Sequence, residues 1–239
     1  IALVLCTIDS TFRRNYFMSE LKNQISQYID TNAKVYQDIS LAIHAKPEVS
    51  DFEYFASQAL SEQLKKEGFE IELPAAGHRT GFAATYKSNK PGPTVVFLAE
   101  YDALAGLGHG CGHNVFGTTS SLAGAALKSV VDRIGGEVRV YGTPGEEGGQ
   151  NGSAKGSFVK KGYLKNVDFA LCVHPGSGPE DGLSTRNYAC APVDIEFWGK
   201  PAHAAGCPQD VGCADLNICS HWCFTTTTHR SHSYSWCDC

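Results

Sequence analysis

The stretch TVVFLAEYDALAGLGHGCGHNVFG, residues 94–117, sets the expected architecture of this chain. Its opening part, residues 94–102, is an apolar run with the length and composition of a buried strand. A glycine-rich loop follows, and the segment 114–132, rich in Ala, Leu and small residues, is predicted to be helical. A strand that leads through a loop into a helix is typical of α/β proteins.

The same alternation of extended and helical segments continues along most of the chain. Apolar residues at helical spacing predict helices at 19–45, 51–67 and 153–161. Extended runs predict strands at 69–73, 81–87, 137–142, 167–174 and 191–199. Strands separated by helical segments therefore predict an α/β fold, with a mostly parallel sheet flanked by helices.

The 239 residues suffice for one large domain, or for one medium domain and part of a second. The only methionine is Met18, and an ordinary amphipathic segment follows it, so we interpret residues 1–17 as an upstream extension without function. This apolar opening has no preceding basic region and no small-residue cleavage site, so a signal peptide is not expected. The composition changes after about Thr185, which predicts a main domain over 18–186 and the start of a second domain over 187–210.

The tail 211–239 has no helical or strand periodicity, and six of the ten cysteines lie at positions 207–239. Its Cys and His residues suggest a zinc module as one alternative, but they form no C-x-x-C pair and have no regular ligand spacing. We favour a disordered tail that replaces the normal continuation of a truncated chain. The other four cysteines are scattered, which is typical of a reducing compartment and predicts a cytoplasmic location.

Composition also excludes several classes of partner. The formal net charge of -5 gives no basic surface of the kind that binds nucleic acid. No apolar run approaches the about 20 residues that a membrane-spanning helix needs. We therefore expect neither nucleic acid nor a membrane as a partner.

Side chains that can bind metal follow three of the predicted strands. His109, Cys111 and His113 follow the strand at 94–102, Glu146 and Glu147 follow 137–142, and His174 ends 167–174. In an open α/β sheet, ligands bind beyond the carboxyl ends of the strands, so these three clusters are expected to meet at one edge. Their convergence predicts a metal site more strongly than any one cluster does.

Each cluster has another interpretation when it is taken alone. Cys111 could be a nucleophile or half of a disulfide, although a Cys/His pair two residues apart on a glycine loop is poorly placed for activation. Glu146 and Glu147 could form a solvated turn, and His174 could end its strand without binding anything. Taken together, one thiolate, two imidazoles and a carboxylate suit zinc best, with cobalt, nickel or manganese as substitutes.

The two adjacent glutamates, Glu146 and Glu147, are predicted to have different roles. One would bind the metal, while the other would accept a proton from a water that the metal acidifies towards a pKa of about 7. This is the chemistry of amide hydrolysis.

Four motifs, in this order, make the resemblance to a known family specific. GHGCGHN (108–114), GTPGEEGG (142–149), CVHPG (172–176) and GKPAHAAGCP (199–208) resemble the M20 family of metallopeptidases and amidohydrolases. The similarity covers about residues 20–210 and is greatest to the branch of aminobenzoyl-glutamate hydrolases, N-acyl-amino-acid hydrolases and dipeptidases. It implies a zinc-peptidase-like α/β domain, a small α+β lid that also makes homodimers, and hydrolysis of small N-acyl amino acids or dipeptides with one or two divalent metals.

The resemblance also implies roles for individual residues. The metal ligands would be Cys111, His113, Glu147 and His174. Glu146 would be the general base, and His203 would be the lid histidine that holds the carbonyl or carboxylate of the substrate. Alternatively, His203 is only a histidine at the start of a helix, without a part in catalysis.

The sequence departs from the family pattern after Gln209. Nothing beyond that residue matches the rest of a lid or the last histidine ligand of the family, so the second metal position is expected to be incomplete. The absence of further sheet elements also predicts exposed apolar surface. Two alternatives therefore stay open, namely a truncated, non-catalytic chain and a cysteine hydrolase that uses Cys111.

Overall fold

A computed structural model describes residues 2–176, 178, 182, 193–194 and 233–234 of the chain, with side chains from Phe17 onward in the first range. The chain divides into two compact units, residues 1–177 and 178–239, which are described separately. The first unit contains the sheet, its helices and nearly all of the predicted site.

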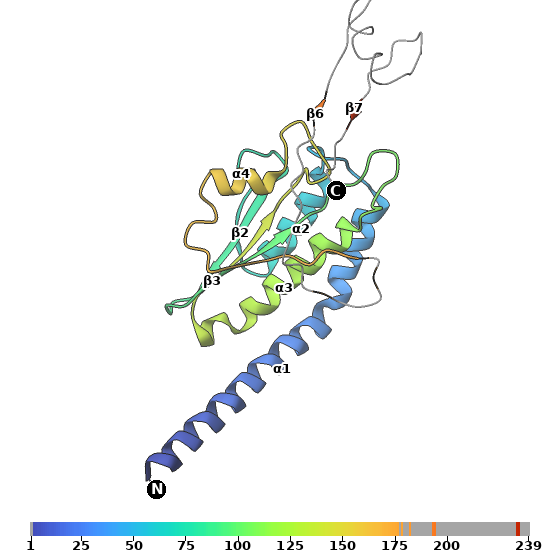
Figure 1. Cartoon of the computed structure of the whole chain (residues 1–239). Coiled ribbons are helices and arrows are strands. Elements are labelled where there is room, and N and C mark those ends of the chain that lie inside the picture. Colours follow the sequence, from blue (N-terminus) through green and yellow to red (C-terminus); the bar gives the residue numbers. More distant parts are fainter. Residues whose placement is uncertain (1, 177, 179–181, 183–192, 195–232, 235–239) are drawn as a thin grey trace, which may run out of the picture. The chain divides into compact units, whose positions relative to one another are not determined.

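The first unit is built around a five-stranded mixed sheet in the order β1-β2-β4-β3-β5 (Figure 1). Its strands are β1 (Glu70–Glu72), β2 (Phe82–Lys87), β3 (Thr94–Ala99), β4 (Glu137–Gly142) and β5 (Phe169–Leu171). The pairs β1–β2 and β2–β4 are antiparallel, whereas β3–β4 and β3–β5 are parallel. The predicted α/β fold, a sheet flanked by helices, is confirmed, but the sheet is mixed and not mostly parallel, because β1 and β2 add to it as antiparallel strands. Its parallel part carries the strand ends where the site was expected.

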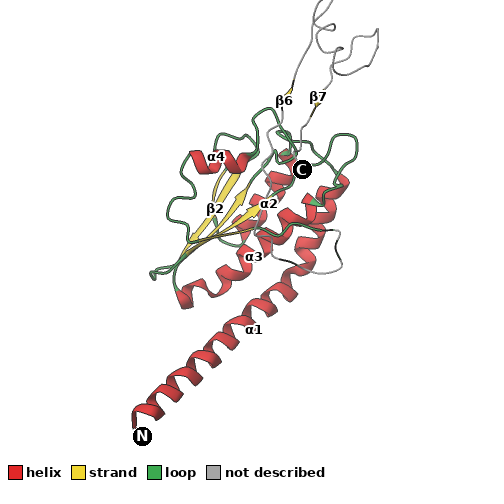
Figure 2. Cartoon of the chain, in the orientation of Figure 1, coloured by secondary structure: helices red, strands yellow, loops and turns green. Residues whose placement is uncertain are grey.

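Helices of this unit lie on both faces of the sheet (Figure 2). They are α1 (Ala2–Ala45), α2 (Tyr54–Lys66), α3 (His113–Ile134) and α4 (Ala154–Lys160). Helix α1 packs mainly on α3. The larger core lies on the face covered by α1, α2 and α3, where Val138 and Val140 of β4 pack with Leu60 of α2. On the other face, Tyr141 of the same strand packs with Phe158 of α4. The alternation of side chains along β4 therefore supplies both cores from one strand.

Several segment predictions can be compared with these elements. Helix α1 continues through Met18, so the expected boundary between residues 17 and 18 falls inside a helix. In the second unit, β6 (Val193–Asp194) pairs with β7 (Ser233–Tyr234), and β6 lies within the predicted strand 191–199. The rest of the segments 187–210 and 211–239 lies outside the described residues. Within the described part of the chain, no helix is long and apolar enough to cross a membrane.

Strand β5 is an edge of the five-stranded sheet and carries exposed apolar side chains. Phe169 is 58% exposed and Leu171 48%, and Val173, just beyond the strand, is 55% exposed.

Helix α3 approaches the sheet closely at Gly124, which gives a prediction about stability. A Cβ atom on Gly124 would lie 2.3 Å from Cγ2 of Val140, which is buried in the larger core. Gly124→Ala is therefore expected to destabilise the fold by about 1–3 kcal/mol, as overpacking does. Gly156 in α4 is the matched control, because a Cβ there meets nothing within 4 Å. Gly156→Ala is expected to stabilise by up to about 1 kcal/mol through helix propensity. Urea unfolding of both variants measures the difference, and equal effects would contradict the packing argument.

Candidate metal centre

His113 lies at the centre of the site because of the turn that precedes it. The loop after β3 ends at Gly112, which has a φ of 75°, a left-handed conformation that favours glycine. Helix α3 then begins at His113, whose side chain is fully buried. The glycine-rich loop thus turns the chain so that the first helical residue faces the carboxyl ends of β3 and β4.

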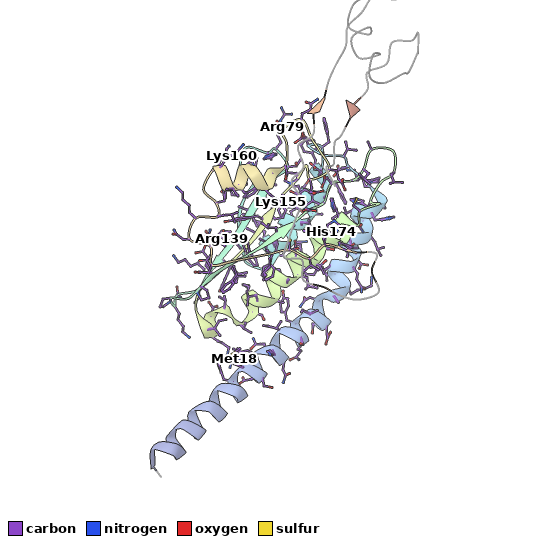
Figure 3. All side chains as sticks on the ribbon, in the orientation of Figure 1. Met18, Arg79, Arg139, Lys155, Lys160 and His174 are labelled. Atoms are coloured by element: carbon purple, nitrogen blue, oxygen red, sulfur yellow. The ribbon has the colours of Figure 1, made fainter. Side chains whose placement is uncertain are left out.

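Two buried carboxylates from the end of β3 flank the imidazole of His113. Nδ1 of His113 lies 3.0 Å from Oδ1 of Asp102, and Nε2 lies 3.0 Å from Oε2 of Glu100. Lys155, which is labelled in Figure 3, lies in the first turn of α4 and forms an ion pair with the other oxygen of Glu100. Neither carboxylate was predicted as a site residue. The signal was present in the sequence, because two acids that close an apolar strand must find partners when they are buried.

Glu146 and Glu147 reach the same imidazole from the loop after β4. An oxygen of each carboxylate lies 3.9 Å from Nε2 of His113. The backbone amide of Glu147 donates to Oδ2 of Asp102 at 2.9 Å, which ties this loop to the end of β3. The structure therefore brings together the ends of two neighbouring parallel strands, as the sequence analysis expected.

His174 follows β5 and completes the cluster. Its ring centroid lies 5.4 Å from that of His113, with the two rings nearly perpendicular, and 5.6 Å from that of Phe116. Two groups of side chains can each place three ligand atoms within 4.8 Å of one another. One is Glu100, His113 and His174, and the other is His113, Glu146 and Glu147.

Cys111 contacts the site but belongs to neither of those groups. It is a free, partly buried cysteine. Its hydrogen bond to Glu147, together with burial and the nearby carboxylates, raises the pKa of the thiol to about 11. In the form without metal, Cys111 is therefore a protonated thiol that donates to a carboxylate, which is not the state of an activated nucleophile. Its role as a ligand stays a prediction.

The remaining predicted residues lie apart from these contacts. His203 lies outside the described residues. His109 stacks on His44 with ring centroids 6.1 Å apart and is in neither group of potential ligands. Burial and the charge of His44 lower the pKa of His109, so its ring is neutral at pH 7. Among the described residues, His109 therefore packs against His44 and is not placed with the potential ligands.

The electrostatics of the site follow from the mutual burial of acids and an imidazole. Burial opposes a charge on His113, but its contacts with Asp102 and Glu100 raise its pKa to about 10. Burial opposes charge on the two carboxylates as well, yet contact with His113 holds their pKa values below the usual range. Burial, and then the charge of Glu100, raises the pKa of Glu146. Without a cation, the imidazole of His113 is therefore protonated on both nitrogens at pH 7 and carries a positive charge.

The donor atoms fit a divalent metal. Oε2 of Glu100 and Nε2 of His113 are both buried and lie 3.0 Å apart, and among the described residues neither has a hydrogen-bond partner beyond this mutual contact. Buried polar atoms with so few partners can take a ligand. Because Nδ1 of His113 is taken by Asp102, Nε2 is the nitrogen left for a metal, and a carboxylate behind the imidazole is the usual arrangement in zinc sites. Imidazole, carboxylate and thiol donors together suit zinc.

Comparisons with known proteins agree with this chemistry. No protein-family profile matches the chain. The chain is 34% identical over 211 residues to one of the subunits of p-aminobenzoyl-glutamate hydrolase from Escherichia coli strain K12, across 80% of this chain and 43% of that protein. It is 32% identical over 207 residues to Xaa-Arg dipeptidase of Mus musculus, across 80% of this chain and 46% of that protein. The chain therefore spans about half the length of these curated relatives.

A solved structure shares the fold. A dinuclear metal-binding peptidase of the M20 family from Bacillus subtilis superimposes with a TM-score of 0.51 and 24% sequence identity, covering 59% of this chain and 42% of that chain. At this identity the likeness shows the fold alone.

Proposed function

Because the chain belongs to the M20 family of metallopeptidases and amidohydrolases, we propose that its metal centre hydrolyses an amide bond in small N-acyl amino acids or dipeptides. The observation that carries the proposal is the cluster of donor atoms around Nε2 of His113, with Oε2 of Glu100 3.0 Å away and an oxygen of Glu146 and of Glu147 each 3.9 Å away. The names of the curated relatives support the bond type, since one cleaves p-aminobenzoyl-glutamate and the other is a dipeptidase.

The metal would be held by Cys111, His113, Glu147 and His174, with zinc as the best fit and one or two ions per site. Glu100 adds a carboxylate that faces the same nitrogen of His113. Asp102 fixes the imidazole by accepting from its Nδ1, and so leaves Nε2 free for the metal. When bound, the metal would supply Lewis-acid polarisation of the substrate carbonyl and would acidify the attacking water.

Glu146 would take the proton from the attacking water and return it to the leaving amine. Its side chain is 39% exposed, so solvent and substrate can reach it, while burial of the remainder and the charge of Glu100 raise its pKa. A raised pKa suits a carboxylate that must both accept and donate a proton near neutral pH. The lid role of His203, a homodimer and a cytoplasmic location belong to the same proposal.

Hydrolysis of p-aminobenzoyl-glutamate and of dipeptides tests the proposal directly. Turnover is expected to be lost on dialysis against a chelator and restored by zinc, because the metal supplies the polarisation. Alkylation of thiols is the control for the cysteine-hydrolase alternative. Turnover that survives the chelator but is abolished by alkylation would support a Cys111 nucleophile and contradict the metal mechanism. A chain that binds zinc without any turnover would instead support a non-catalytic role.

A further inference from the structure

The four residues before helix α2, Ser50–Glu53, lie beside both loops of the metal centre, and we call them the anchor segment. Just before them, Val49 pairs with Ala103 in an isolated parallel bridge. The amide of Ala103 donates to the carbonyl oxygen of Glu48 at 2.8 Å. The anchor segment therefore starts next to the chain that leaves β3, immediately after Asp102.

Ser50 contacts the carboxylate that fixes His113. Its hydroxyl donates to Oδ2 of Asp102 at 2.9 Å. The same oxygen accepts the backbone amide of Glu147 at 2.9 Å. Asp102 thus connects the anchor segment both to the imidazole of His113 and to the loop after β4 that carries Glu146 and Glu147, which we call the glutamate loop.

Asp51 holds the far end of the glutamate loop. Its carboxylate accepts from the backbone amide of Asn151 at 3.2 Å and from Nδ2 of the same residue at 3.1 Å. Gly149 passes so close that a Cβ atom there would lie 2.3 Å from Oδ2 of Asp51. Asp51 makes these contacts from a backbone φ of 69°, a left-handed conformation that is uncommon outside glycine, although Asp adopts it more readily than most residues. Such conformations persist where surrounding contacts enforce them, often at functional sites.

Glu53 holds the near end of the same loop. It is fully buried, and it accepts from the backbone amide of Gly145 at 3.0 Å and from the hydroxyl of Thr80 at 2.8 Å. Burial raises the pKa of Glu53 to about 7. A carboxylate is therefore kept in a costly environment, where both of its oxygens are occupied.

An ordinary structural explanation for Glu53 is that it caps α2, since it occupies the N-cap position. It makes no capping hydrogen bond. The free amides of Phe55 and Ala56 are instead satisfied by the carboxylate of Glu48. Because another acid caps the helix, Glu53 is free to bind the glutamate loop.

We propose that Asp51 and Glu53 are positioning residues for Glu146 and Glu147. Their carboxylates hold the amides of Gly145 and Asn151, on either side of the two glutamates, while Asp102 holds the amide of Glu147 between them. Three fixed amides set the path of a glycine-rich loop that has few backbone hydrogen bonds of its own. This inference rests on the proposed function, because it assigns a role relative to the metal ligand and the base.

Four variants test the inference. Glu53→Met keeps the volume of the side chain but removes the acceptor, whereas Glu53→Gln keeps an oxygen for Gly145. Asp51→Gly removes the carboxylate of Asp51 and tolerates the left-handed backbone conformation, so it introduces no backbone strain of its own. Phe52→Ala is the matched control, because its side chain is 59% exposed. Each protein is measured by hydrogen exchange of the amides at 145–151 and by competition titration with zinc.

Glu53→Met and Asp51→Gly are expected to exchange the loop amides faster and to bind zinc about tenfold more weakly, as is typical when a residue that orients a ligand is lost. Glu53→Gln and Phe52→Ala are expected to stay within about threefold of the unmodified chain. Unchanged amide exchange and zinc affinity in Glu53→Met and Asp51→Gly would overturn the inference. A loss of zinc affinity in Glu53→Gln as large as that in Glu53→Met would overturn it as well. If the unmodified chain bound no zinc, the proposed function would fail, while the exchange of the loop amides would still decide whether Asp51 and Glu53 hold the loop.

Discussion

Glu146→Gln is expected to lower kcat for amide hydrolysis about 1,000-fold while zinc binding is retained. Removal of a general base typically costs about 100- to 10,000-fold. The amide of glutamine has nearly the size of the carboxylate, but it cannot take a proton from the attacking water. In the structure Glu146 is a distinct side chain from the proposed ligand Glu147, although both lie 3.9 Å from the imidazole of His113.

The matched control is Glu62→Gln, the same change at an exposed position on α2, which is expected to leave kcat unchanged. Steady-state kinetics and zinc content are measured on the same preparations, with the longest available form of the protein. If Glu146→Gln turned over normally, the assignment of the base would be wrong. If it lost its zinc, Glu146 would be a ligand, and the roles of the two glutamates would have to be exchanged.

His113→Ala is expected to weaken zinc binding by more than about 100-fold, beyond the effect of a residue that only orients a ligand. His113 belongs to both groups of potential ligands, so its loss breaks both. His109→Ala is the control, because it removes an imidazole from the same loop without touching either group. Equal losses in the two variants would show that the loop fold, and not ligation, controls the affinity.

Zinc uptake is also expected to release protons. Without metal, the imidazole of His113 has a pKa of about 10 and the thiol of Cys111 a pKa of about 11, so both are protonated at pH 7. Zinc binds the neutral imidazole and the thiolate, so up to about two protons leave per zinc ion and the affinity rises with pH over the whole range below about 10. Titration calorimetry in buffers of different ionisation enthalpy measures the number of protons released per zinc ion bound. Cys111→Ser is expected to remove about one proton from the count, and an unchanged count would exclude Cys111 as a ligand.

Most of the fold could be predicted because its elements have strong local patterns. The strand expected at 137–142 is β4 in both bounds, and the helix expected at 114–132 is α3 to within two residues at either end. The direction of β1 and β2 could not be predicted in the same way. Side-chain alternation marks a strand but not the direction of its neighbour, which here is fixed by pairing of Phe82 with Gly142 far along the chain.

The site was predicted less completely than the fold. The strand-end argument found His113, Glu146 and Glu147, which lie together, because it depends only on where strands finish. It missed Glu100 and Asp102, which belong to the apolar run itself and were counted as part of a strand. It also missed Asp51 and Glu53, because acids at the start of a helical pattern resemble ordinary helix-start residues. The helix was expected from residue 51 but begins at Tyr54, since the preceding residues are turned towards the glutamate loop.

The most direct test of the metal centre is the zinc content of the folded chain after reconstitution and removal of excess metal. Elemental analysis, with folding checked by circular dichroism, is predicted to find at least one tightly held zinc ion per chain, and close to none in His113→Ala. A folded chain that holds no zinc, or that holds as much after loss of His113, would contradict a metal centre at the carboxyl ends of β3 and β4.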